Sequence, residues 1–226
     1  QINMSRMRTG SYMDSREKRQ YFDEITWHLL NDEKPSLYIN SLSEKDVFKE
    51  YPFYMLVLLK KTEQSAKYHP EGNVWNHTMM VVDEAARVRD KSEDAAAFMW
   101  AALLHDIGKP PTTRMRKGRI TSYDHDKEGE KLCVEFLKEL TGEKEFITKV
   151  SALVRYHMHM LYILKDLPFA DKAGLINGKV SPDELALLCR CDRLGRTGAD
   201  ESQVEEEYHK FLDRLHNMTR QNLIKQ

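Results

Sequence analysis

The stretch Ala101-Ala102-Leu103-Leu104-His105-Asp106-Ile107-Gly108-Lys109 places an adjacent histidine and aspartate at the end of an apolar run. The alanine-rich residues before it predict a helix over 94–107, capped by Asp94. A helix this apolar is expected to be buried, and a buried helix end does not hold an imidazole beside a carboxylate unless a partner satisfies them. Gly108 predicts a left-handed helix terminator, and Pro110-Pro111 predicts that the helix cannot continue.

Other histidines and acids lie on predicted helices before and after the His105–Asp106 pair. His77 falls midway along residues 73–89, His125 begins residues 124–140, His157 ends residues 145–157, and Asp192 lies late in a helix that starts at Ser181. Imidazole nitrogens and carboxylate oxygens suit Zn, Fe, Mn or Ni. Two such ions a few ångströms apart can hold a phosphate and acidify a water. A single histidine is more often structural, so the prediction rests on the group.

The remaining pattern predicts an all-α protein, a compact helical bundle with an N-terminal helical extension. We expect a polar tail over 1–15, a helical segment over 16–66 and one domain over 67–226. Predicted N-terminal helices cover 15–30, 37–42, 44–51 and 52–61. A small hairpin is expected at Lys117-Gly118 and a loop over 166–180. Ser181-Pro182-Asp183-Glu184 predicts a helix start with a capping box.

The last predicted helix carries an apolar stripe that fits core packing or, as the alternative, the contact of a homodimer. The stripe comprises Val204, Tyr208, Phe211, Leu215 and Met218. Cys189 and Cys191 are two apart on a predicted helix, so they point to different faces and read as buried thiols rather than a metal pair.

The 226 residues carry 35 basic and 36 acidic side chains, a net charge of −1. This balance gives no support to general nucleic-acid binding, which needs a basic footprint. A local basic pocket and binding of tRNA stay open as alternatives that the net charge does not support. The sequence lacks both an apolar run long enough to span a membrane and a secretory signal, so we expect a cytoplasmic location. One basic loop follows Lys109: Arg114, Arg116, Lys117 and Arg119 fit either a solvated surface or a site for an anionic substrate.

The string His105-Asp106-Ile107-Gly108-Lys109, with His77 upstream and Asp192 downstream, resembles the HD-domain phosphohydrolases. Residues 69–78, His-Pro-Glu-Gly-Asn-Val-Trp-Asn-His-Thr, resemble the opening segment of the HD domain in bacterial CCA-adding tRNA nucleotidyltransferases. Residues 191–196, Cys-Asp-Arg-Leu-Gly-Arg, resemble its closing segment, and the helices over 21–66 resemble the body that precedes it. The resemblance covers roughly residues 21–196.

The resemblance implies roles for individual residues. His77, His105, Asp106 and Asp192 match the four metal ligands of HD proteins. The second ion of the binuclear members implies two more ligands, His125 and His157, with Asp106 bridging the ions. Lys109 matches a position that contacts substrate phosphate, while the alternative is a solvated lysine. Arg193 and Arg196 follow the last ligand and fit either phosphate binding or ion pairs between helices.

The implied activity is hydrolysis of a phosphomonoester or cyclic phosphodiester of a small phosphorylated substrate, such as a nucleotide, by metal-activated water. Two alternatives stay open: a diiron oxygenase, and a non-catalytic HD module that senses a nucleotide. Residues 1–66 show no glycine turn with paired carboxylates, so this stretch is not expected to transfer nucleotides to tRNA. His69 is expected to be a turn residue, with a place in the wall of the pocket as the alternative, and His159 is expected to be a bystander.

Overall fold

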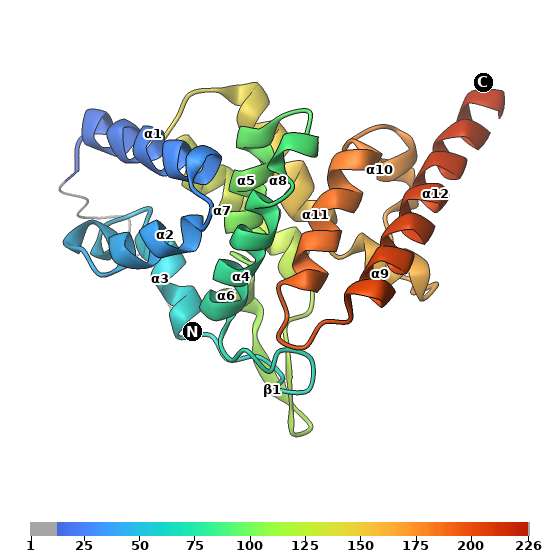
Figure 1. Cartoon of the computed structure of the whole chain (residues 1–226), viewed down its shortest axis with the longest axis horizontal. Helices are drawn as coiled ribbons and strands as arrows, with labels where there is room; N and C mark the ends of the chain where they lie inside the picture. The colour runs from blue at the N-terminus through green and yellow to red at the C-terminus, as the bar shows by residue number, and fades with distance from the viewer. Residues whose placement is uncertain (1–12, 226) are drawn as a thin grey trace.

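The computed structural model describes residues 13–225, and its architecture is all-α, as the sequence predicts. Long helices pack side by side, and the strands form a single small hairpin (Figure 1). The predicted polar tail over 1–15 lies mostly outside the described residues. Within the described part of the chain, no helix is both long and apolar enough to cross a membrane.

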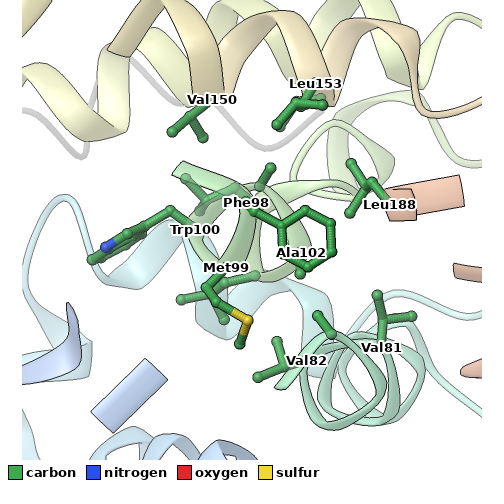
Figure 2. Close-up of a cluster of buried hydrophobic side chains, with 14 of the residues drawn as sticks. Val81, Val82, Phe98, Met99, Trp100, Ala102, Val150, Leu153 and Leu188 are labelled. Carbon is green, nitrogen blue, oxygen red and sulfur yellow. The ribbon is translucent and has the colours of Figure 1, made fainter. Parts of the chain in front are cut away.

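Helix α5 (Ala95–Leu104) is the central element, and its residues 97–104 are all buried. An all-round apolar helix needs neighbours on every side. It is enclosed by α4 (Val74–Ala86), α8 (Lys144–Tyr156), α11 (Pro182–Leu194) and α1 (Ser15–Asn31). Figure 2 shows side chains from three of these neighbours packed around it. The core therefore fixes the end of α5, where His105 and Asp106 follow.

The N-terminal helices pack onto this same core. They are α1, α2 (Pro35–Ser43), the 3-10 turn η2 (Asp46–Lys49) and α3 (Tyr54–Lys60). Phe22 of α1 stacks on Trp100 at a centroid distance of 5.1 Å, and the Trp100 indole donates to Thr26 Oγ1 at 2.9 Å. The predicted helix over 44–51 is only η2, and α3 begins two residues after Pro52 rather than at it. Helix α4 ends at Ala86, before the predicted Arg89, and the turn η3 (Arg89–Lys91) follows.

The segment after His105 corrects the prediction for Gly108. Its φ is −81°, a right-handed conformation, and the chain continues into a short helix, α6 (Lys109–Thr112), with proline in its first turn. Proline is tolerated there because the first turn of a helix has no internal acceptor for its N–H groups. Glycine is needed for space: a Cβ on Gly108 would lie 2.0 Å from His125 O and 2.5 Å from Gly129 N. Gly108 thus allows α7 (His125–Lys138) to approach closely.

The predicted hairpin is present as β1 (Arg114–Arg116) paired with β2 (Arg119–Thr121). It projects from one end of the bundle (Figure 1).

The C-terminal part contains α9 (His159–Leu164), α10 (Lys172–Ile176), α11 and α12 (Glu201–Lys225). Helix α10 interrupts the predicted loop over 166–180, because Asp171 caps it at Gly174 N. The predicted capping box is absent: Ser181 makes no side-chain cap, and Glu184 instead accepts from Ser92 Oγ and Glu93 N.

Side chains in the C-terminal helices follow the predicted packing. Val204, Phe211 and Leu215 of α12 are buried, as core packing predicts. Cys189 and Cys191 are buried free thiols.

Candidate metal centre

Three of the four histidines at the centre are held in the same way. His105 Nδ1 lies 2.8 Å from Ala102 O, His125 Nδ1 lies 2.7 Å from Ser122 O, and His157 Nδ1 lies 2.6 Å from Val154 O. In each case the carbonyl belongs to the residue three positions earlier. A carbonyl can only accept, so Nδ1 carries the proton and Nε2 of a neutral ring presents its lone pair.

His77 is held by two acceptors from distant parts of the chain. Its Nδ1 lies 3.0 Å from Gly195 O and 3.1 Å from Glu71 Oε1. Gly195 can approach because it lacks a side chain: a Cβ there would lie 2.5 Å from Val81 Cγ2. On the other side of the ring, Nε2 lies 2.9 Å from Asp192 Oδ1.

The Asp106 carboxylate lies between the four rings. Oδ2 is 3.3 Å from His105 Nε2 and 3.9 Å from His77 Nε2. Oδ1 is 3.5 Å from His125 Nε2 and 3.7 Å from His157 Nε2. The two oxygens thus face different pairs of histidines, and the carboxylate is shared between two groups of ligand atoms.

These groups fit a metal. Ligand atoms of His77, His105 and Asp106 lie within 4.8 Å of one another, and so do those of Asp106, His125 and His157. Among residues 13–225, His105 Nε2 and both Asp106 oxygens are buried and form no hydrogen bond, and the one ammonium at the carboxylate, that of Lys109, lies beside Oδ2 alone. Lone pairs gathered around a buried carboxylate repel one another, and a cation would relieve that repulsion. The residues present therefore suit a divalent transition metal.

The charge at the centre agrees with this fit. Burial opposes ionisation of Asp106, yet Lys109 and His105 hold the pKa of its carboxyl well below the usual range. Burial likewise opposes ionisation of Asp192, but Arg196 and His77 hold its pKa well below the usual range. Both acids are therefore anionic at neutral pH. Burial lowers the pKa of His125, which keeps that ring neutral and available as a ligand.

The predicted phosphate-binding residues are placed differently from one another. Lys109 is buried, 2.7 Å from Asp106 Oδ2, and donates to Gln64 Oε1 at 2.7 Å, so it is not a solvated lysine. Arg196 lies 3.6 Å from Asp192 Oδ1. Arg193 is not brought to the centre: its guanidinium pairs with Glu207 of α12 at 3.7 Å, which is the helix-tying alternative.

A cavity of about 800 Å³ opens above the centre. Its floor holds Asp106, Lys109, His125, His157, Asp192 and Arg196, and its walls come from the 64–69 loop, the hairpin and the segment after α9. A phosphate-bearing small molecule would fit this volume. Four of the six predicted ligands and both central cations, Lys109 and Arg196, therefore line the cavity, whereas His77 and His105 lie behind its surface.

Comparison with known proteins agrees with this arrangement. Residues 74–218 match the HD domain family. The chain belongs to the HD domain family. The HD domain begins at α4 and ends within α12, so it includes all six predicted metal ligands.

Curated relatives extend the similarity beyond the HD domain. The chain is 27% identical over 190 residues to a multifunctional CCA protein of Pasteurella multocida, covering 80% of this chain and 44% of that protein. It is 25% identical over 224 residues to the one from Mannheimia succiniciproducens, covering 93% and 51%. The chain therefore spans about half the length of the curated relatives it matches. This confirms the resemblance inferred from the motifs.

Three residues around the HD centre were not among the predicted site residues. The side chain of Glu71 is buried beside His77, His69 Nδ1 lies 2.9 Å from Glu71 Oε1, and Gln64 Oε1 accepts from Lys109. Burial and Lys109 lower the pKa of His69 to about 4. An acid two positions after a histidine, just before a ligand-bearing helix, was a usable signal for Glu71. His159 is buried and accepts from Asp171 N, away from the ligand groups.

Proposed function

We propose that this chain is a metal-dependent phosphohydrolase that hydrolyses a phosphomonoester or cyclic phosphodiester of a nucleotide. The observation that carries the proposal is the Asp106 carboxylate, shared between two pairs of histidine Nε2 atoms beside Lys109 on the cavity floor. His77, His105, Asp106 and Asp192 would hold one Fe, Mn, Ni or Zn ion, and His125 and His157 would complete a second site around Asp106.

A bound metal would acidify a water molecule and offset the charge of phosphate oxygens. Lys109 and Arg196 would bind the phosphate, since both cations line the floor and their partners are the ligand carboxylates themselves. Arg196 Nε is also buried with no hydrogen-bond partner among the described residues, so it can donate to an anion. Water adds to phosphorus, the P–O ester bond breaks, and the leaving alkoxide takes up a proton.

The test begins with purified protein, stripped of metal and reloaded with Mn, Fe, Ni or Zn. Nucleoside monophosphates and nucleoside 2′,3′-cyclic phosphates are then assayed for phosphate release or ring opening. We expect turnover that needs metal and that Asp106→Asn abolishes. His209→Ala serves as the matched control, because His209 is an exposed histidine on α12. If the loaded protein is inert on every phosphoester yet consumes oxygen with reduced iron, the oxygenase alternative replaces this proposal.

Lys109→Met separates substrate binding from metal binding. Removing a cation 2.7 Å from a ligand oxygen takes away a charge that competes with the metal, so metal content is expected to stay the same or rise. Turnover should fall about 100-fold, as for loss of one group that stabilises the transition state. Elemental analysis and phosphate release check the two halves. Loss of metal would show that Lys109 supports the ligands instead.

A further inference from the structure

The β1–β2 hairpin concentrates positive charge in a protein that is otherwise balanced. Arg114, Arg116, Lys117 and Arg119 place four cations within six residues, while the whole chain has a net charge of −1. All four are exposed, and none forms an ion pair with an acid within the described part of the chain. Four unpaired like charges on one hairpin repel one another, so the arrangement is suited to an anionic partner.

Exposed rings accompany these cations around the cavity mouth. Tyr123 is 61% exposed, Tyr68 58% and Phe169 59%. The Arg116 guanidinium lies 5.1 Å from the centre of the Tyr123 ring, and Phe169 meets Tyr162 at 5.6 Å. All of these residues line the cavity. Large rings left in water around one opening mark a surface that a ligand covers.

Hairpin and cavity form one continuous surface. Arg116, Ile120, Thr121 and Tyr123 line the cavity, and the chain runs from them directly into His125 on its floor. Thr113 and Ser122 close the base of the hairpin through a 2.7 Å hydroxyl contact. A ligand that extends out of the cavity therefore passes the rings and Arg116, which line it, before it reaches the other three hairpin cations, which do not.

We propose that the hairpin and the rim rings bind the end of a single-stranded nucleic acid, whose terminal phosphate reaches the Asp106 centre. The proposal rests on the proposed function, because that terminal phosphate is the group hydrolysed. Backbone phosphates lie along Arg114, Lys117 and Arg119, and the terminal base stacks on Tyr123. Rings that accept bases beside cations that follow a backbone are the general features of single-strand binding. A mononucleotide would leave the cations beyond the rim without a partner.

Binding is measured on metal-loaded protein with a fluorescent hexauridylate that ends in a 3′-methylenephosphonate, a terminal phosphate analogue that cannot be hydrolysed because CH2 replaces the ester oxygen, competed by the matching uridine 3′-methylenephosphonate. We expect the hexamer to bind at least tenfold more tightly than the mononucleotide. The hexamer Kd should rise with salt, with a slope of about 0.7 per phosphate neutralised. Arg114→Gln, Lys117→Gln and Arg119→Gln together should lower that slope by about 2, because three phosphate contacts are lost. In this triple variant, the Kd of the hexamer should rise far more than the Kd of the mononucleotide.

The control replaces three exposed lysines that do not line the cavity, Lys91, Lys138 and Lys144, each by Gln. This variant has the same net charge as the hairpin variant and should bind the hexamer like wild type.

Tyr123→Ala should weaken hexamer binding about fivefold or more, whereas Tyr123→Phe should retain it, because stacking needs only the ring. The proposal is overturned if hexamer and mononucleotide bind equally, or if both triple variants weaken binding alike. Because binding is read without turnover, failure of the hydrolase proposal is seen separately, in the phosphate-release assay. Tighter binding of an acidic peptide or of anionic vesicles than of the hexamer would also overturn the proposal of single-strand binding.

Discussion

At the residue scale, the hydrogen bonds at Nδ1 orient the histidine rings of the centre. The rings of His105, His125 and His157 are each oriented by a backbone carbonyl at Nδ1, and their Nε2 atoms face Asp106. His77 differs from the other three, because its ring also contacts a carboxylate, that of Glu71. Burial opposes ionisation of Glu71, but the contact with His77 brings the pKa of its carboxyl down to about 2. A carboxylate behind a histidine ligand fixes the ring and raises its basicity.

Glu71→Gln is expected to weaken metal binding by about 10- to 100-fold, the range found for partners that support a metal ligand. The amide keeps the size of the side chain but loses the charge that polarises His77. Competition with a metal-sensitive chelating dye measures the affinity. Glu63→Gln is the control, because Glu63 is an exposed acid on the same connecting segment. Equal metal affinity in both variants would show that Gly195 O alone orients His77.

Gly108→Ala tests the close approach of α6 to α7. The new methyl group would meet His125 O at 2.0 Å, backbone that cannot move aside cheaply. Overpacking typically costs about 1–3 kcal/mol, and a backbone clash lies at the upper end. The free energy of unfolding from urea titration should fall by about 3 kcal/mol, and metal content should fall with it because His125 moves. Gly118→Ala, on the exposed hairpin turn, separates this clash from the ordinary cost of replacing a glycine: it strains a positive φ but meets no atom within 4 Å.

At the scale of elements, short helices support the residues next to the ligands. Helix α10 lies in a segment whose composition predicts a loop, and its cap is the reason it forms. Asp171 Oδ1 accepts from Gly174 N at 2.9 Å, and Oδ2 accepts from Tyr156 OH at 2.7 Å. Tyr156 directly precedes His157, so the cap connects α10 to the end of α8.

The cap is expected to make stability depend on acid pH. The bonds from Gly174 N and Tyr156 OH lower the pKa of Asp171 below its ordinary value. Its contribution is therefore complete above the unfolded pKa of about 3.9 and is lost as pH falls through the lower folded pKa. Asp171→Ala should cost about 1 kcal/mol at pH 7 and less at pH 3. Urea unfolding at both pH values measures this, and an equal cost at the two would show that the charge contributes nothing.

At the scale of the whole molecule, the centre joins distant parts of the chain. Its six predicted ligands come from α4, the ends of α5 and α8, the start of α7 and α11, and Asp106 touches both ligand groups. Because an unfolded chain cannot hold these ligands together, metal binding adds to folding stability.

A free metal concentration of 100 times the Kd should raise the free energy of unfolding by about 2.7 kcal/mol. For a chain of this size, that corresponds to a rise in Tm of about 5–10 °C. Asp106→Asn should remove this rise, since both groups lose their shared ligand. Thermal unfolding monitored by circular dichroism checks the prediction. The same rise in Asp106→Asn as in wild type would place the stabilising ion elsewhere.

Two ions per chain are expected at saturation, because His125 and His157 face one oxygen of Asp106 while His77 and His105 face the other. Equilibrium dialysis with excess Mn followed by elemental analysis gives the stoichiometry. His125→Ala should reduce it to one. A wild-type value that stays at one would assign His125 and His157 to substrate phosphate.

The sequence alone was enough to predict the helices and the buried apolar α5, and to select six candidate metal ligands that the fold brings close together, because periodicity and the identity of side chains are local properties. It also favoured family membership, since the string around His105-Asp106 is contiguous. It could not reveal that Gly108 serves α7, that Glu71 supports His77, or that Lys109 is buried while Arg193 turns toward α12. Those features depend on which helices lie next to one another in the bundle and on the distance between their backbones. Both are set only when the helices pack. The shared position of Asp106 between two pairs of rings likewise exists only in the folded protein, because four separate helices bring those rings to one carboxylate.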